Sequence, residues 1–196
     1  MTAAMISPEP GVHDGRFAGH RFAQIRCASF VLLMMPLAAC GAEYRRLDIA
    51  PSSPDSTKNF VGGQGRVKVH FENYNGRADV EVFPEPPLTI QAGDGRCDVD
   101  GGVWVRSSVH LSSSGRVLMV QEYSGSADEL VFYSTQTCKQ ELRIDVSGAK
   151  WAMSGERLLI GRSCTSDAVA SCPKVVTYEL DENELPSPAK TSNGNP

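Results

Sequence analysis

Three carboxylates lie close together in a glycine-rich stretch of the chain, at Asp94, Asp98 and Asp100. Clustered oxygen ligands are the kind that Ca²⁺ prefers in proteins. Their spacing differs from the D-x-D-x-D-G pattern of an EF-hand loop, and no glutamate stands where that loop places its last ligand. A polar turn beside a cysteine is therefore the favoured interpretation over a calcium site. We expect neither a bound metal nor a cofactor.

Residues suited to catalysis are sparse. The sequence contains no G-x-S-x-G nucleophile elbow, no H-E-x-x-H zinc helix and no P-loop. Beyond residue 40 the only histidines are His70 and His110, and a solvated histidine is the favoured interpretation of each. Scattered Ser, His and Asp residues can still meet in space, since a triad is recognised by its geometry. A hydrolase with a dispersed site is thus an alternative, but we expect the protein not to be an enzyme.

Residues 118–128 contain side chains that suit a binding loop. Gln121, Glu122 and Tyr123 are followed by Ser-Gly-Ser, and Tyr, Ser and Gly are favoured in loops that bind other proteins. A plain hairpin loop is the favoured interpretation, and an adaptable polar binding surface is the alternative.

Four cysteines follow residue 40, at Cys97, Cys138, Cys164 and Cys172. An even set in an exported chain indicates two disulfides. Their spacing does not suit a zinc cage, which usually contains a close C-x2-C pair, and no C-x-x-C redox motif is present. Of the three pairings we favour Cys97 with Cys138 and Cys164 with Cys172.

The elements that position these residues are predicted to be strands. In residues 66–71 and 79–83 apolar and polar side chains alternate, and an Asn-Tyr-Asn-Gly turn separates the two segments. Further short apolar runs follow at the spacing of an all-β meander, and no sustained helical periodicity occurs after residue 40. The expected fold is a small antiparallel sandwich or barrel over residues 66–180. The core candidates are Val67, Val69, Phe71, Val80, Val82, Trp104, Leu118, Val120, Phe132, Ile144, Trp151, Leu159, Val176 and Tyr178.

A weak repeat of about 40 residues is visible in the second half of the chain, as in the blades of a β-propeller. Residues 114–120 can be laid over 154–160, and residues 130–133 over 175–178. Only about three such units fit, whereas a closed propeller needs at least four blades. The repeated use of similar hairpins is the favoured explanation.

The beginning of the chain has the features of an export signal. Arg21 and Arg26 precede a short apolar run that ends in Leu37-Ala38-Ala39-Cys40. This ending resembles the lipobox of bacterial lipoproteins. The resemblance implies that residues 1–39 are a signal peptide, that Cys40 carries acyl chains such as palmitate, and that the domain is anchored to a membrane. Because Gly41 rather than Asp follows, the resemblance favours the outer membrane, facing the periplasm, over the inner membrane.

Two alternatives concern this signal. A cleaved secretory signal that leaves Cys40 free is the alternative to lipidation. Residues 1–20 are an unusually long and partly acidic preface, for which we favour a start codon assigned too early.

The segments on either side of residues 66–180 are expected to lack fixed structure. Residues 40–65 contain few apolar side chains and are predicted to be a flexible tether that follows the lipidated cysteine, and the polar residues 181–196 a disordered tail. Removal of residues 1–39 takes away three arginines and two acids, which leaves a net charge of about −5. This charge gives no reason to expect a nucleic acid partner.

These features predict a lipid-anchored protein of the cell envelope. The favoured function is a non-catalytic module that binds an envelope protein or glycan, or that supports a larger assembly. An inhibitor of a periplasmic enzyme is the alternative, since lysozyme-inhibitor lipoproteins are likewise small, β-rich and disulfide-bonded. The S-G-x-x-Y motif of those inhibitors does not fit here, because Ser154-Gly155 is followed by Glu-Arg-Leu.

Overall fold

The computed structural model describes residues 42–85 and 87–189, so the predictions for residues 1–39, Cys40 and Gly41 lie outside the described residues. The described chain is all-β, with one short 3-10 turn, η1 (Val169–Ser171). It contains no helix of the length and apolar character that a membrane-spanning segment requires. The strands are β1 (Tyr44–Arg46), β2 (Ala50–Pro51), β3 (Asn59–Gln64), β4 (Val67–Glu72), β5 (Val82–Pro84), β6 (Leu88–Ala92), β7 (Gly95–Val99), β8 (Val103–Ser112), β9 (Val117–Ser124), β10 (Ala127–Ser134), β11 (Gln140–Asp145), β12 (Ala149–Ser154), β13 (Arg157–Arg162), β14 (Lys174–Leu180) and β15 (Pro186–Pro188).

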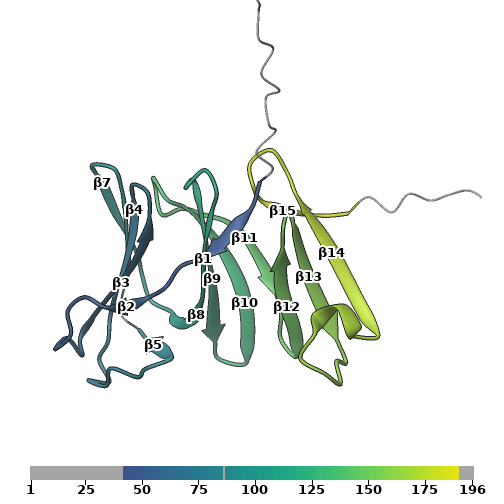
Figure 1. Ribbon diagram of the computed structural model, residues 1–196, viewed down its shortest axis with the longest axis horizontal. Coiled ribbons are helices and arrows are strands. Elements are labelled where there is room, and N and C mark those ends of the chain that lie inside the picture. The colour runs from purple at the N-terminus through teal and green to yellow at the C-terminus, as the bar shows by residue number, and fades with distance from the viewer. Residues whose placement is uncertain (1–41, 86, 190–196) are drawn as a thin grey trace, which may run out of the picture. The chain divides into compact units, whose positions relative to one another are not determined.

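These strands form three antiparallel sheets (Figure 1). Sheet B has the order β2-β3-β4-β6-β7, sheet A the order β1-β8-β9-β10-β11 with β5 added to β8, and sheet C the order β12-β13-β14-β15. Consecutive strands pair through short turns in most of the fold, as a meander requires. Both β1 and β5 depart from this rule, since each pairs with β8, and β4 therefore pairs with β6. The prediction of an all-β antiparallel sandwich is therefore confirmed.

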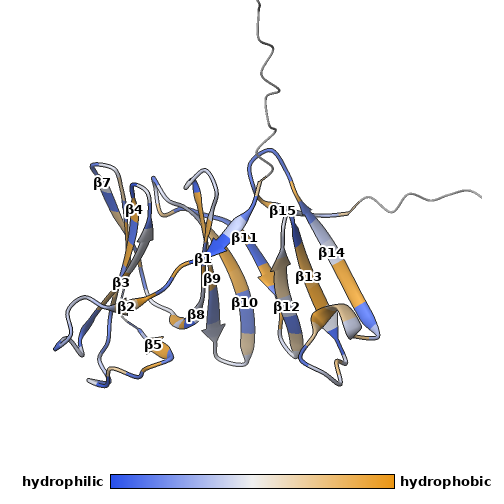
Figure 2. Ribbon diagram, viewed as in Figure 1, coloured by the Kyte–Doolittle hydropathy of each residue, from blue (hydrophilic) through white to orange (hydrophobic). Residues whose placement is uncertain are grey.

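Sheet A lies between the other two sheets and contributes to both hydrophobic cores. Leu118 and Val120 of β9 are buried against side chains of sheet B, whereas Met119 of the same strand is buried against sheet C. This two-sided burial explains the apolar run in β9, where alternation is lost because both faces are covered. In Figure 2 apolar residues, coloured orange, occur along strands of all three sheets, interspersed with polar residues in blue.

Residues 44–64 belong to the folded domain, so the predicted tether and the boundary at residue 66 are corrected. Tyr44, Leu47, Ile49 and Phe60 are all buried, and β3 pairs with β4 along its whole length. The segment is poor in apolar residues, but these four large side chains all enter a core. Strand pairing supplies the rest of its stabilisation, because it satisfies the backbone polar groups of an otherwise polar segment.

The predicted disordered tail is likewise corrected for residues 181–189, while residues 190–196 lie outside the described residues. β15 pairs with β14, and the side chain of Glu184 is buried. Ser112 Oγ donates a hydrogen bond to Glu184 Oε2 at 2.8 Å, and Tyr44 Oη donates to the Glu184 carbonyl at 2.8 Å. A buried carboxylate and a buried backbone carbonyl both need such donors, and the two donors lie about 70 and 140 residues away in the sequence.

Most of the predicted core residues are buried or half-buried, but the register of sheet C differs from the expectation. Leu158 and Ile160 enter the core, and Leu159 between them is half-buried. Val176 is 50% exposed. In residues 157–162 apolar side chains occupy adjacent positions. The sequence therefore does not define which set of alternate residues faces the core.

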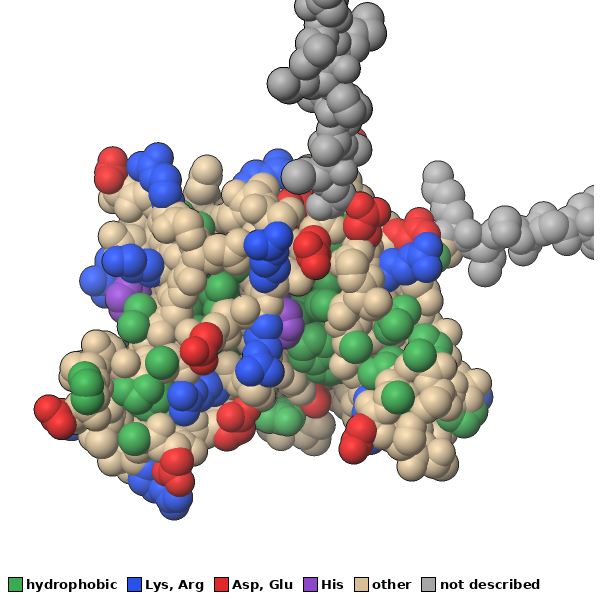
Figure 3. Space-filling model, viewed as in Figure 1, with side chains coloured by type: hydrophobic (Ala, Val, Ile, Leu, Met, Phe, Trp, Pro, Cys, Tyr) green, Lys and Arg blue, Asp and Glu red, His purple; other side chains and the backbone are tan. Residues whose placement is uncertain are grey.

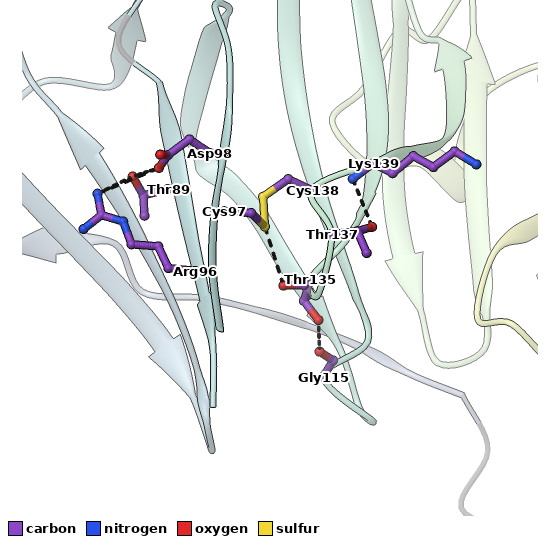
Figure 4. Close-up of a disulfide and its surroundings, with 9 residues drawn as sticks. All are labelled: Thr89, Arg96, Cys97, Asp98, Gly115, Thr135, Thr137, Cys138 and Lys139. Carbon is purple, nitrogen blue, oxygen red and sulfur yellow. Dashed lines mark hydrogen bonds and ion pairs between the residues drawn. A yellow bond between two sulfur atoms is a disulfide. The ribbon is translucent and has the colours of Figure 1, made fainter. Parts of the chain in front are cut away.

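Both disulfides have the favoured pairing. Cys97 in β7 is joined to Cys138 in the loop after β10, and Cys164 is joined to Cys172 beside η1. The first bond crosses from sheet B to sheet A (Figure 4). Thr135 Oγ1 donates to the Gly115 carbonyl at 2.7 Å and holds the loop that carries Cys138 against the β8-β9 turn. The bond therefore joins two fixed parts of the fold.

Candidate functional site

The hairpin between β9 and β10 projects an exposed, rigid tip. Ser124 pairs with Ala127, so only Gly125 and Ser126 form the loop. Gly125 has φ of +62°, as the first position of a type II′ turn requires. Tyr123 is 38% exposed, and residues 124–126 are exposed as well. We call residues 123–126 the hairpin tip. It combines an aromatic side chain with two hydroxyls on a turn that has little conformational entropy to lose on binding.

The base of the tip is braced from the side of sheet C. Gln121 Nε2 donates hydrogen bonds to both carboxylate oxygens of Asp128, at 2.8 and 3.0 Å. The Gln121 Oε1 atom accepts from Trp151 Nε1 at 3.3 Å. The backbone N–H of Asp128 donates to Ser147 Oγ at 3.0 Å. Burial raises the pKa of the Asp128 carboxyl, and the hydrogen bond from Gln121 opposes that rise. The two strands are thereby fixed just below the tip.

A second set of polar contacts braces the opposite face of the same strands. Arg143 of β11 forms ion pairs with Glu129 and with Glu122, the latter at 3.5 Å. Tyr133 Oη donates to Glu122 Oε2 at 3.4 Å. Burial raises the pKa of Glu122, while the Arg143 guanidinium lowers it. The hairpin is held from both faces, so its tip is a preorganised feature.

A groove of about 500 Å³ opens between sheets A and C and reaches the base of the hairpin. Its wall on sheet A includes His110 and Gln121, and its wall on sheet C includes Trp151 and Met153. The indole and imidazole rings meet edge to face, with centroids 5.5 Å apart. Figure 3 shows apolar side chains gathered on this face between the two sheets, beside one of the two described histidines. Along β9, Gln121 and Tyr123 lie on the same strand face, so Tyr123 of the tip is on the side of the strand on which the groove lies.

The histidines that were candidates for catalysis are not assembled into a catalytic site. His110 Nδ1 is buried and has no hydrogen-bond partner among the described residues, so no carboxylate orients the ring. Burial lowers the pKa of His110 to about 4. His70 is exposed on β4 near Arg96 and Lys68, and burial and these two cations lower its pKa. Neither ring has the partners that a general base in a triad requires.

The three carboxylates considered for calcium are not brought together. Residues 95–99 form β7, so Asp94 lies in the turn before this strand, Asp98 lies within it, and Asp100 follows its end. Asp98 accepts a hydrogen bond from Thr89 Oγ1 at 2.5 Å and lies 3.8 Å from Arg96 (Figure 4). No group of three potential metal ligands occurs within residues 42–85 and 87–189. The glycines of this segment suggested a loop. In the structure, however, Gly95 is the first residue of β7 and Gly101 follows the end of that strand.

Comparison with known proteins identifies the family. The sequence profile described as Immune protein Tsi1 matches residues 40–182, well over half of the chain. The chain belongs to the Tsi1 family of immune proteins. The Immune protein Tsi1 of Pseudomonas aeruginosa strain PAO1 is 37% identical to it over 164 residues, which are 80% of this chain and 94% of the relative. Membership of an immune protein family confirms the prediction that the chain is not an enzyme.

No motif of the folded domain revealed its family, and residues 118–128 were predicted to form a plain hairpin loop. The tip is indeed a hairpin loop. What the sequence did not reveal is the contact of Gln121 with Trp151, which joins the base of the hairpin to the wall of the groove. These two residues lie in different sheets, and no local pattern signals that they meet. In the sequence, the large apolar side chains of Trp151 and Met153, which follow Lys150, were the available sign of this surface.

Proposed function

We propose that this protein is an immunity protein that binds a toxic enzyme in the cell envelope and blocks its active site. An immune protein protects the cell that makes it, and a direct way to do so is to occupy the toxin. The family supports the inhibitor alternative of the sequence analysis over a general structural module. The partner is a protein in this proposal, and the glycan is set aside.

The observation that carries the proposal is the braced hairpin tip. A tight turn with exposed Tyr123, Ser124 and Ser126 is narrow enough to enter an enzyme cleft. Its hydroxyls offer donors and acceptors to polar groups at the bottom of such a cleft. Because hydrogen bonds on both faces hold the strands below the tip, little ordering entropy opposes binding. The adjoining groove, with Trp151 at its wall, adds the aromatic contact area that interfaces favour.

The location of the protein in the cell envelope is a further part of the proposal. Lipidation at Cys40, with the outer membrane as the destination, rests on the resemblance of residues 37–40 to a lipobox. An anchored inhibitor would intercept a toxin on the periplasmic side of the membrane. Detection of acyl chains on the mature N-terminal cysteine by intact mass spectrometry tests this part separately.

Affinity capture from the native envelope tests the proposed inhibition. The mature protein should retain one enzyme in stoichiometric amount and abolish its activity in a purified mixture. The matched variants are Ser126→Arg in the tip and Glu156→Arg in the β12-β13 turn, which is also a two-residue loop that begins with a glycine of positive φ. Capture should be lost for the first variant and kept for the second.

Two outcomes oppose the proposal. If a captured enzyme remains fully active when bound, the protein is a carrier or scaffold and not an inhibitor. If the Glu156→Arg variant loses capture while Ser126→Arg keeps it, the contact surface lies on sheet C rather than at the tip.

A further inference from the structure

The first described residues and the hairpin tip lie at opposite ends of sheet A. Tyr44 of β1 pairs with Ser112, the last residue of β8, whereas Val103 at the start of β8 pairs with Tyr123, the first residue of the tip. The backbone N–H of Ser113 donates to the Glu43 carbonyl at 2.7 Å, so the chain enters the fold beside the β8-β9 turn. Figure 1 shows β1 at the end of the sheet away from the β9-β10 turn. Six strand residues separate Val117 from Tyr123 along β9, a rise of about 20 Å.

The chain between the lipobox cysteine and the fold is very short. Ala42 is already part of the described structure and lies beside Ser113, Ser114 and Arg116. Because an extended chain spans at most about 3.6 Å per residue, Cys40 cannot be more than about 7 Å from Ala42. The tether of some 25 residues that the sequence suggested, and with it a freely moving domain, is replaced by a two-residue connection.

We propose that the end of sheet A formed by the β8-β9 turn and residues 181–184 rests directly on the phospholipid headgroups, so that the hairpin tip is held away from the bilayer. This inference rests on the lipidation of Cys40 and adds an orientation to the proposed function. Acyl chains must enter the hydrocarbon layer, and two residues cannot lift the fold above the headgroup region. The turn at residues 113–116 and the strap at 181–184 surround Ala42 and therefore face the membrane.

The charges at this end indicate that the anchor, not electrostatic attraction, holds the domain there. A hollow of about 570 Å³ beside Ala42 is lined by Arg116 and by the carboxylates of Glu156, Asp181, Glu182 and Glu184. Acidic side chains outnumber the cation in this hollow, so the hollow is not a basic site for anionic lipids. The orientation is thus enforced by chain length and should not depend on the fraction of anionic lipid.

The orientation is measurable with the full lipoprotein in vesicles of phosphatidylethanolamine and phosphatidylglycerol that carry a headgroup nitroxide. A fluorophore is attached to a single added cysteine, in Glu182→Cys or in Ser126→Cys. The nitroxide should quench most of the emission of the label at residue 182 and leave the label at residue 126 unchanged. In a third protein, a Gly/Ser segment of about 15 residues is inserted between Gly41 and Ala42, which spans about 20 Å and should abolish the quenching at residue 182.

Equal quenching at residues 182 and 126, or stronger quenching at 126, would overturn the inference. So would quenching at residue 182 that survives the insertion, because the contact would then not depend on the short connection. Intact mass is recorded first. A mass without acyl chains overturns the anchor and this orientation together, but it leaves the capture of an enzyme by the hairpin tip untouched.

Discussion

Trp151 donates a hydrogen bond from Nε1 to Oε1 of Gln121 at 3.3 Å, across the boundary between sheets C and A. Through the amide of Gln121 this contact reaches Asp128 on the neighbouring strand. A residue of the C-terminal sheet thereby helps to fix the hairpin that we propose as the inhibitory element.

Replacement of Trp151 by Phe should weaken this link while keeping an aromatic ring in the groove. We expect the free energy of unfolding to fall by about 0.5–1.5 kcal/mol, the usual contribution of one such hydrogen bond. Urea unfolding of W151F, of Q121L and of the double variant measures the coupling between the two residues. Strictly additive losses would show that the hydrogen bond contributes nothing.

The disulfide between Cys97 and Cys138 should contribute more stability than the one between Cys164 and Cys172. The first closes a loop with a sequence separation of 41 and the second a loop with a separation of 8, which the chain-entropy relation converts to about 3.9 and about 2.5 kcal/mol. Paired Cys→Ala variants compared by denaturant unfolding test the order. Equal losses, or a larger loss for the short loop, would contradict it.

His110 should make the fold lose stability as the pH falls from 6.5 towards 4. Burial lowers the pKa of the folded ring to about 4, so in this window the unfolded chain binds a proton that the native protein does not. Arg46, Lys150 and Asp167 are the charged groups around the groove, and of these Arg46 also lowers the pKa. The loss should reach at most about 3 kcal/mol at pH 4.

NMR titration of the His110 ring gives the folded pKa, and H110Q should show a flatter profile of stability against pH between 6.5 and 4. A ring that titrates near 6.5 in the folded protein would contradict the burial of His110.

Glu184 should make the fold lose stability at a lower pH than His110 does. Burial raises the pKa of its carboxyl, but hydrogen bonds from Ser114 and Ser112 and the nearby Arg116 outweigh this effect, and the pKa lies below its usual value of 4.5. A lowered folded pKa means that stability is fully present above pH 4.5 and is lost as the pH falls below it.

The variant E184Q should lose about 1–3 kcal/mol at neutral pH, because buried hydroxyl donors lose a charged acceptor. Its stability should also change less below pH 4.5 than that of the natural protein. Thermal unfolding at pH 7 and pH 3.5 checks both effects. Identical pH profiles for the two proteins would exclude Glu184 as the group responsible.

The sequence predicted the parts of the fold that local patterns encode. Alternation in residues 66–71 correctly placed Val67, Val69 and Phe71 inside. The cysteine count predicted two disulfides, and the pairing that we favoured among the three possible ones is the observed pairing. The sequence did not predict β1, because Tyr44 and Leu47 are isolated apolar residues that become buried only when β8, over sixty residues later, offers a pairing edge.

The candidate site was predictable in composition but not in geometry. Tyr123 and the Ser-Gly-Ser sequence marked residues 118–128 as a loop suited to binding. Its extension into a groove depends on the packing of sheet C against sheet A, where Trp151 meets His110 and Gln121. Such contacts between distant segments leave no trace in hydrophobic periodicity.

The affinity of the captured enzyme for variants of the two matched turns tests the central claim most directly. Titration calorimetry compares the natural protein with S126R and E156R, whose substituted residues each occupy the second position of a two-residue loop. The account predicts that S126R loses at least tenfold in affinity, a change of about 1.4 kcal/mol, and releases the enzyme from inhibition, while E156R binds and inhibits as the natural protein does. Undiminished binding and inhibition by S126R would contradict the assignment of the hairpin tip as the inhibitory element.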